Sequence, residues 1–449
     1  MIRMAHIQGS LANCLLFLLI PVYSMAQNPI LPIGTYIADP SAKVWDDGKL
    51  YIYGSRDEST DYWCSYDHYV LSTDNMIDWQ IHKDAFFSKG PKDQVPYNDK
   101  VLYAPDCEKF DEKYYLYYSQ PDQNAPEGVA VSDKPEGPFE NGVAIDLKGY
   151  NQIDPSVFVD DDGEAYYLWG QFTLKMAKLN DDRMSINEET LQDNILTESE
   201  HYFHEGGYLT KRNGIYYLVY ADISRADMPT CIGYATSKSV FGPYTYGGVI
   251  VDSDHCDPDV WNNHGSIIEF KDQWYVLYHR SSHGSSKMRR ACIEPITFDT
   301  NGNIPEVEMT SQGAGAPLSA FNTIEAERAC LLYGNAQLKL HTENNEELTG
   351  IRNGDRAAYK YIDFGNGKGG RVEFTVSPGL SAGKIRVNVG KSWHQNIAVV
   401  EIPERTEDRK WITVTADLKK VSGIQELWLT FIGSNTEMYS IDSFQFYSR

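Results

Sequence analysis

Three acidic residues occupy the same relative position in three separate segments of the chain. Asp39, Asp154 and Glu205 each precede, by nine positions, a glycine in a turn-like stretch. If the three segments fold alike around one axis, their carboxyl groups lie at the same depth. The equal spacing therefore predicts a cluster of three acids.

Such a cluster suits acid and base chemistry. Buried carboxylates repel one another, so at least one is expected to have a raised pKa and to stay protonated near neutral pH. A protonated acid beside an ionised one can cleave a glycosidic bond, because one group protonates the leaving oxygen while the other activates water. Each acid taken alone has a simpler structural interpretation, such as Asp39 forming a turn before Pro40. The shared spacing favours catalysis.

The three acids lie at the starts of hairpins that recur along the chain. Each hairpin has a short strand, a turn rich in Asp, Gly, Asn or Lys, and a second strand of Tyr, Leu, Val and Trp, which suits a buried strand. The five segments are residues 39–55, 104–119, 154–170, 204–221 and 264–280. A third strand follows most of them. This repetition predicts an all-β, five-bladed β-propeller, since a β-sandwich would not repeat one pattern five times.

The second and fifth hairpins begin with Asp106 and His264. Asp106 has a different offset from its turn, so we expect it to position the substrate or neighbouring groups. His264 is expected near the axis, where a histidine satisfied within the core is the alternative interpretation.

The pattern changes after a stretch of small residues at 311–323, which predicts a linker. Residues 324–449 contain many short strands, typical of a β-sandwich. The predicted organisation is a signal peptide at 1–26, a propeller at 27–310, the linker at 311–323 and a jelly-roll-like sandwich at 324–449.

Composition restricts the partners. The net charge of −23 argues against nucleic acid and anionic membranes, whereas a neutral glycan is unaffected by that charge. A basic start and a short apolar run predict a cleaved secretory signal, and thus export to the periplasm or medium. No later segment is apolar and long enough to span a membrane. The sequence does not indicate an oligomeric state.

Six cysteines remain after cleavage of the signal, and none form a Cys-x-x-Cys pair. A zinc site is therefore not expected. A core of this size needs no covalent staples, so we expect buried free thiols with at most one disulfide.

Residues 30–310 resemble glycoside hydrolase family 43. The resemblance rests on "ADPS" at 38–41, "YAPDCEKFDEKYYLYYS" at 103–119, "IDPSVFVDDDGEAYYLWG" at 153–170, "HEGG" at 204–207 and "HGSIIEFKDQWYVLYHR" at 264–280. It implies that Asp39 is the general base, that Glu205 is the general acid, and that Asp154 modulates the pKa of the acid. It also implies inversion at the anomeric carbon, with no cofactor for catalysis.

The same resemblance suggests further contacts. His264 matches an axial histidine that often neighbours an ion in the central channel, and imidazole would contact calcium through water. Tyr103 stands where an aromatic ring forms a wall against the sugar. Arg280 and Arg289 match positions from which an arginine binds sugar hydroxyls, with a surface arginine as the simpler alternative.

Residues 323–449 resemble carbohydrate-binding module family 6. The resemblance rests on "IEAER" at 324–328, "NGDRAAYKYIDFG" at 353–365, "WITVTADL" at 411–418 and "IDSFQFY" at 441–447. It implies a structural calcium held by Glu325, Glu327 and Asp442, and a sugar-stacking role for Trp411. Gly350 stands where a second aromatic residue is common, so a sandwich that only supports the propeller is the alternative.

Together these features predict an exported, inverting and exo-acting glycosidase that acts on plant-type polysaccharides or their oligosaccharides. We expect release of α-L-arabinofuranosyl residues, with β-D-xylosidase and galactan or β-galactofuranoside hydrolysis as alternatives. A related retaining family that cleaves fructans would need an Asn-Asp-Pro motif and a Glu-Cys motif, which this chain lacks. A non-catalytic sugar-binding propeller would lack a carboxyl group, yet all three acids are present.

Overall fold

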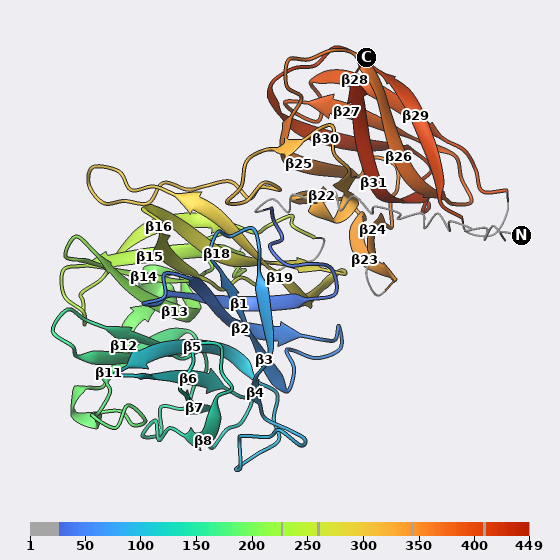
Figure 1. Ribbon diagram of the computed structural model, residues 1–449. Coiled ribbons are helices and arrows are strands. Elements are labelled where there is room, and N and C mark those ends of the chain that lie inside the picture. The colour runs from blue at the N-terminus through green and yellow to red at the C-terminus, as the bar shows by residue number, and fades with distance from the viewer. Residues whose placement is uncertain (1–26, 226–227, 258–260, 343–344, 407–409, 449) are drawn as a thin grey trace, which may run out of the picture.

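The computed structural model describes residues 27–225, 228–257, 261–342, 345–406 and 410–448 (Figure 1). The predicted signal peptide lies outside these residues. Helical structure within the described residues is limited to η1 (Glu188–Thr190), α1 (Glu198–His201) and η2 (Ala326–Arg328). The prediction of an all-β chain is confirmed.

Five antiparallel sheets follow one another along the first two thirds of the chain (Figure 1). The first contains β1 (Tyr36–Val44), β2 (Leu50–Asp57), β3 (Asp67–Thr73) and β4 (Gln80–Phe87). The second contains β5 (Tyr103–Phe110), β6 (Lys113–Ser119), β7 (Glu127–Ser132) and β8 (Glu140–Ala144). The third contains β9 (Ser156–Val159), β10 (Ala165–Trp169), β11 (Thr173–Lys178) and β12 (Gln192–Thr197). The fourth contains β13 (Phe203–Arg212), β14 (Ile215–Asp222), β15 (Cys231–Ser237) and β16 (Thr245–Asp252), and the fifth contains β17 (Ser266–Phe270), β18 (Gln273–Ser282) and β19 (Ser285–Ile296).

The first strands of these sheets contact one another in a closed order. β1 contacts β5, β5 contacts β9, β9 contacts β13, β13 contacts β17, and β17 contacts β1. The five predicted hairpins begin in or just before these strands. Their leading residues therefore face a shared central region, as the equal spacing of the three acids requires.

Four of the sheets have a fourth strand that the sequence pattern did not predict. These strands are β4, β8, β12 and β16, and most of their residues are exposed or half-buried. Each lies at the outer edge of its sheet, where the side chains meet water. Such strands carry no continuous apolar run by which they could be recognised.

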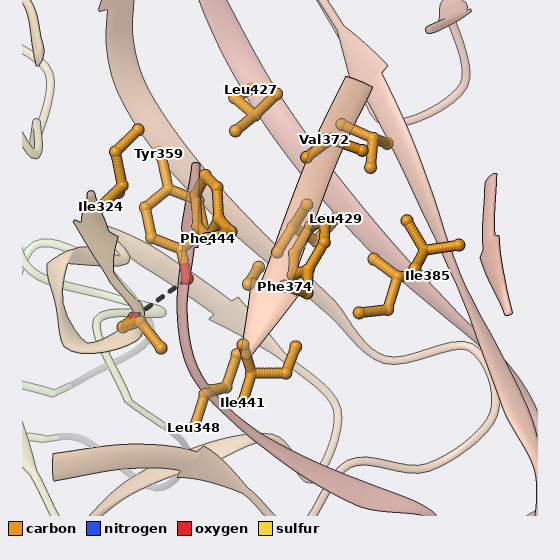
Figure 2. Packing of buried hydrophobic residues seen from close by; sticks show 14 of the residues in the cluster. Ile324, Leu348, Tyr359, Val372, Phe374, Ile385, Leu427, Leu429, Ile441 and Phe444 are labelled. Atoms are coloured by element: carbon orange, nitrogen blue, oxygen red, sulfur yellow. Dashed lines mark hydrogen bonds between the residues drawn. The ribbon is translucent and has the colours of Figure 1, made fainter. Parts of the chain in front are cut away.

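The second part of the chain consists of two sheets around one core. One sheet contains β20 (Leu318–Ser319), β22 (Leu331–Tyr333), β25 (Arg356–Asp363), β27 (Gly383–Val389), β28 (Gln395–Ile402) and β30 (Ile424–Gly433). The other contains β21 (Ile324–Glu325), β23 (Gln337–Thr342), β24 (Asn345–Thr349), β26 (Gly370–Pro378), β29 (Ile412–Leu418) and β31 (Tyr439–Ser448). Figure 2 shows the core between them, where the rings of Phe374 and Phe444 stack with centroids 5.2 Å apart. Tyr359 meets Phe444 edge-on, and its hydroxyl donates to the carbonyl of Ala326.

The connection between the two parts is packed rather than loose. The backbone N–H of Ser311 donates to the carbonyl of Lys360, and β20 pairs in parallel with β25. One apolar cluster contains residues of the fourth and fifth sheets together with Cys330, Ala358 and Trp428 of the second part. The hydrophobic core therefore continues across the junction.

A buried carboxylate also joins the two parts. Glu346 in β24 has no exposed surface and accepts hydrogen bonds from the hydroxyl of Tyr36 and from Nη1 of Arg290, both at 2.8 Å. Tyr36 lies in β1 and Arg290 in β19. The sandwich thus holds two strands of the first part through one charged group.

Glu346→Gln is expected to lower the free energy of unfolding by about 3–5 kcal/mol, because it leaves the buried guanidinium of Arg290 without its counter-ion. Urea unfolding followed by fluorescence measures the loss. Glu401→Gln is the matched control, since the pair between Lys384 and Glu401 is exposed and such pairs contribute at most about 1 kcal/mol. Equal effects of the two changes would contradict the role given to Glu346.

Two other sequence expectations can be compared with the structure. All six cysteines in the described residues are buried and free, as predicted. No helix in the described part of the chain has the length and apolar character needed to cross a bilayer.

Candidate active site

The three predicted acids line one cavity. It has a volume of about 260 Å³ and lies where the first strands of the five sheets converge. Its lining residues are Asp39, Trp63, Cys64, Tyr103, Ile153, Asp154, Gln171, His204, Glu205, Trp261, Asn262, His264 and Arg289. The structure thus brings Asp39, Asp154 and Glu205 together with Tyr103, His264 and Arg289.

Local breaks in strand pairing aim the acids inward. The register between β1 and β2 shifts between Ala38 and Ser41, so Asp39 lies in a bulge with φ of 51°. The pairing of β13 with β14 shifts on both sides of Glu205. A bulge re-aims a side chain that would otherwise follow the alternation of the strand.

Gly206 explains the glycine pair that follows the acid. Its φ is +68°, and a Cβ atom there would lie 2.6 Å from Cδ2 of His264. A Cβ on Gly207 would lie 2.6 Å from Leu174. Glycine at 206 accepts the positive φ and avoids the ring of His264, and glycine at 207 leaves room for Leu174, so β13 approaches His264 and the third sheet while presenting Glu205 to the cavity.

Asp39 is held as an ionised base. It is 6% exposed, and it accepts hydrogen bonds from the hydroxyl of Ser55 at 2.6 Å and from Nη1 of Arg289 at 2.8 Å. Burial alone would raise the pKa of Asp39, but Arg289, assisted by His264, His279 and Ser55, lowers it to about 2. The carboxylate can therefore accept a proton from water throughout the usual pH range.

Arg289 is itself fixed by a second carboxylate. Its Nε and Nη2 donate to the two oxygens of Asp57, both at 2.9 Å, and its backbone N–H donates to the same residue at 2.9 Å. Asp57 is buried at the end of β2. This bidentate pairing aligns the guanidinium plane, so Arg289 here bridges two carboxylates and also borders the cavity.

Replacing Arg289 should change the pH dependence of the reaction. In the double variant Arg289→Met with Asp57→Asn, the guanidinium no longer offsets the burial of Asp39, so the pKa of Asp39 should rise. We expect the acidic limb of kcat/KM to move upward by about one pH unit or more. Arg289→Lys keeps a charge and should move the limb less. An acidic limb that stays in place in the double variant, with the fold verified by circular dichroism, would contradict this assignment.

Asp154 and His264 lie beside the base. His264 Nδ1 is 3.7 Å from an oxygen of Asp39 and 3.8 Å from an oxygen of Asp154. Burial, together with the charges of Glu205 and Asp39, raises the pKa of Asp154 well above its usual range. Burial lowers the pKa of His264, which favours the neutral imidazole. The pKa of Asp154 is therefore shifted upward, which is the direction expected from the sequence for at least one of the three acids.

Glu205 is positioned by two amides. Nε2 of Gln171 donates to one carboxyl oxygen at 2.8 Å, and Nδ2 of Asn262 lies 3.4 Å from the other. The side-chain oxygen Oδ1 of Asn262 in turn accepts a hydrogen bond from Nη1 of Arg289 at 3.3 Å. A continuous polar network thus connects the candidate acid with the arginine that holds the candidate base.

Aromatic rings form the walls of the cavity. Tyr103 lines it as predicted, and burial raises the pKa of its hydroxyl to about 12, so this group keeps its proton. Trp63 and Trp261 meet edge to face with centroids 5.5 Å apart, and Arg289 lies over the ring of Trp63. Rings beside hydrogen-bonding groups are typical of sugar sites, because a sugar ring has both C–H faces and hydroxyl edges.

Asp106 and Arg280 do not line the cavity. Asp106 accepts hydrogen bonds from Ser41 and from the backbone of Val157, and it pairs with buried Lys43. Arg280 is 1% exposed and binds Tyr278, Glu294 and the carbonyl of Thr310. The prediction of substrate contact for these two residues is corrected, because both are occupied within the protein.

Several residues of the site were not predicted from sequence. Gln171 and Asn262 bind Glu205, Trp63 and Trp261 form the walls, and Asp57 lies behind the cavity and holds Arg289. All of them lie at strand ends or in connecting segments, where no periodic pattern indicates which way a side chain points. The position of Asn262 two residues before His264 is the one local signal that could have suggested it.

The residues predicted to bind sugar or calcium in the sandwich do not line the catalytic cavity. Trp411 directly precedes β29, and its indole N–H donates to His341 at 3.0 Å. Glu325 lies close enough to Asp442 for that charge, together with burial, to raise the pKa of Glu325. Glu327 lines a second, smaller cavity between the two parts of the chain, together with Arg290, and one of its buried carboxyl oxygens has no hydrogen-bond partner.

The carboxylates of Glu325, Glu327 and Asp442 were predicted to hold one calcium ion. Among the described residues, no set of three or more His, Cys, Asp or Glu side chains is arranged to hold a metal ion. A calcium bound by Glu325, Glu327 and Asp442, an ion beside His264 and sugar stacking on Trp411 stay predictions.

Comparison with known proteins identifies the family. The profile of "Glycosyl hydrolases family 43" matches residues 26–304. The chain belongs to glycosyl hydrolase family 43. It is therefore an O-glycosyl hydrolase, and the profile of "Carbohydrate binding module (family 6)" matches residues 325–448 of the same chain.

Two relatives of this family 43 enzyme align with nearly the whole chain, and a third is shorter. A xylosidase/arabinosidase of Thermoclostridium stercorarium is 29% identical over 91% of this chain and 96% of its own. The crystal structure of an arabinoxylan arabinofuranohydrolase from Bacillus subtilis covers 95% of this chain and 99% of its own, with 24% identity and a TM-score of 0.54, which supports the fold. A β-xylosidase/α-arabinofuranosidase from a compost metagenome, solved with xylotriose, is 30% identical over 63% of this chain and 97% of its own, with a TM-score of 0.54.

Proposed function

We propose that this enzyme is an exported, inverting and exo-acting glycosidase that releases terminal pentosyl residues, above all α-L-arabinofuranosyl residues, from plant-type polysaccharides or oligosaccharides. The observation that carries the proposal is the convergence of Asp39, Asp154 and Glu205 in one small cavity. We further propose that the five sheets are the blades of a five-bladed propeller whose axis passes through this cavity. The cyclic contacts among the first strands support this arrangement.

The proposed mechanism assigns one step to each acid. Asp39 removes a proton from a water molecule as the water attacks the anomeric carbon. Glu205 donates its proton to the glycosidic oxygen as the bond to the leaving group breaks. Attack from the face opposite to the leaving group inverts the configuration. Asp39 then releases its proton to solvent, and Glu205 takes up another.

Asp154 is proposed to help Glu205 regain its proton between turnovers. Burial, with the charges of Glu205 and Asp39, raises the pKa of Asp154, so its carboxyl group holds a proton more readily than an exposed aspartate does. We propose that this proton is available to the leaving oxygen through Glu205. Nδ1 of His264 lies 3.7 Å from Asp39 and 3.8 Å from Asp154, so the imidazole contacts both carboxyl groups.

The size of the cavity supports removal of terminal residues. A volume of about 260 Å³ is at the lower end of ligand-binding cavities, which suits one sugar ring better than a long chain. Trp63 and Trp261 line it in edge-to-face contact, and Trp261 is 36% exposed.

The choice of sugar rests on the relatives. Those from Thermoclostridium stercorarium and Bacteroides ovatus are named xylosidase/arabinosidase, and one from Bacillus subtilis is named arabinoxylan arabinofuranohydrolase. β-D-Xylosides are therefore the second candidate substrate. A β-D-galactofuranosidase of Aspergillus niger is 27% identical over 64% of this chain, which keeps galactofuranosides as a third.

A substrate panel tests the proposal. The full chain is incubated with nitrophenyl α-L-arabinofuranoside, β-D-xyloside and β-D-galactofuranoside, and proton NMR identifies the anomer that forms first. We expect the arabinofuranoside to be hydrolysed fastest, with the first product of opposite anomeric configuration to the substrate. A first product of unchanged configuration would overturn inversion, and absence of hydrolysis across the panel would overturn the pentosidase assignment.

A further inference from the structure

Phe172 has an unusual backbone conformation for its residue type. It lies between β10 and β11 with φ of 65°, and half of its side chain is exposed. Bulky residues rarely adopt the left-handed region, which is strained for any side chain with a Cβ atom. Exposing a large apolar ring adds a second unfavourable feature, and such conformations cluster at ligand sites.

The backbone around Phe172 is held on both sides. Its N–H donates to the carbonyl of His204 at 2.6 Å, and its own carbonyl accepts from the N–H of Glu198 at 3.3 Å. The ring meets that of His204 edge-on, with centroids 5.3 Å apart. His204 lines the catalytic cavity, so the ring of Phe172 is fixed beside the rim.

The ring of Phe172 lies on the same side of the cavity as Glu205, the proposed acid. Gln171, the preceding residue, donates to Glu205 at 2.8 Å, and His204 directly precedes Glu205 in β13. The proposed acid protonates the oxygen of the leaving group, so the leaving group must lie on the Glu205 side of the cavity. Phe172 is an exposed ring directly beside Gln171 and His204.

We infer that Phe172 is a specificity-determining residue. Its ring stacks on the first sugar of the leaving group, which is the remainder of the chain, and not on the terminal pentosyl residue that is bound in the cavity. This inference rests on the proposed function. A flat apolar ring suits the C–H face of a pyranose, and half of Phe172 is exposed and so accessible to such a sugar. The strained turn is retained because it presents the ring to the substrate.

Phe172→Gly tests the inference, because glycine accepts a φ of 65° without strain. We expect kcat/KM on a trisaccharide with a terminal pentosyl residue to fall by about tenfold, whereas the inhibition constant of the free pentose, which fills only the inner cavity, should stay within about twofold. The melting temperature should stay the same or rise. Phe172→Tyr, which keeps the flat ring, should retain most of the activity.

Tyr202→Gly is the matched control. Tyr202 also has a positive φ, of 57°, and is 42% exposed, but its ring packs against Tyr246 in the outer strand β16, away from the axis. This change should not alter trisaccharide hydrolysis. Equal losses in the two glycine variants, or a lower melting temperature for Phe172→Gly, would overturn the role of Phe172 in binding.

The outcomes separate this inference from the proposed function. If the parent enzyme hydrolyses the nitrophenyl pentosides while Phe172→Gly hydrolyses the trisaccharide as fast as the parent does, the inference fails and the proposed function stands. If the parent hydrolyses no pentoside, both fail.

Discussion

Asp39→Asn is expected to reduce hydrolysis of every substrate by about 10⁴-fold, the upper end of what general base catalysis contributes. The amide cannot accept a proton from water, and no other ionised carboxylate occupies this position. Asparagine has nearly the same shape and can still accept the hydrogen bond of Arg289, so the fold should be retained. Because water attack fails regardless of the leaving group, nitrophenyl pentosides and oligosaccharides should lose activity equally.

Asp39→Gly provides the control for this prediction. With added azide, a nucleophile that needs no deprotonation, it should form a glycosyl azide of inverted configuration. Initial rates and NMR of the product measure both effects. Azide adducts of retained configuration, or activity of Asp39→Asn close to that of the parent enzyme, would contradict the assignment of the base.

Glu205→Gln is expected to reduce the rate of hydrolysis by a factor that depends on the leaving group of the substrate. Glutamine cannot supply a proton, so hydrolysis of oligosaccharides should fall by about 10³-fold or more. A dinitrophenyl pentoside releases an acidic phenol that needs little protonation, and its hydrolysis should fall by about tenfold or less. The slope of log kcat against the pKa of the leaving phenol measures the difference.

Gln171→Leu is a useful companion variant to Glu205→Gln. It removes the amide that holds the carboxyl group but keeps the acid itself, so its loss should be smaller and less dependent on the leaving group. If Glu205→Gln lost the same factor on dinitrophenyl and oligosaccharide substrates, Glu205 would not be the proton donor.

The sequence allowed the three acids to be found because each lies near or just before the start of an equivalent inner strand. Equal offsets from the turn reflect equal positions in repeated hairpins, and a repeat preserves depth along the axis. His264 was found through the same regularity, and Tyr103 through the resemblance to family 43. The repeat was therefore sufficient to place the three acids and His264 at the site.

The remaining site residues depend on tertiary structure. Asp57 binds Arg289 although 232 residues separate them, and no local pattern indicates such a contact. Asp106 and Arg280 show the opposite error. Their positions in the sequence predicted that they line the cavity, but buried partners within the protein hold them away from it. The outer strands were missed for a related reason, since their exposed side chains lack the apolar run by which a strand is recognised.

The continuous core between the two parts has a consequence for how such enzymes change over time. A domain on a loose tether can be exchanged by moving its gene segment alone. Here the sandwich shares Cys330, Ala358 and Trp428 with the core of the fourth and fifth sheets, and Glu346 needs Tyr36 and Arg290. A transplanted sandwich would require a host that already carries these complementary residues, so the two halves are expected to have been inherited together.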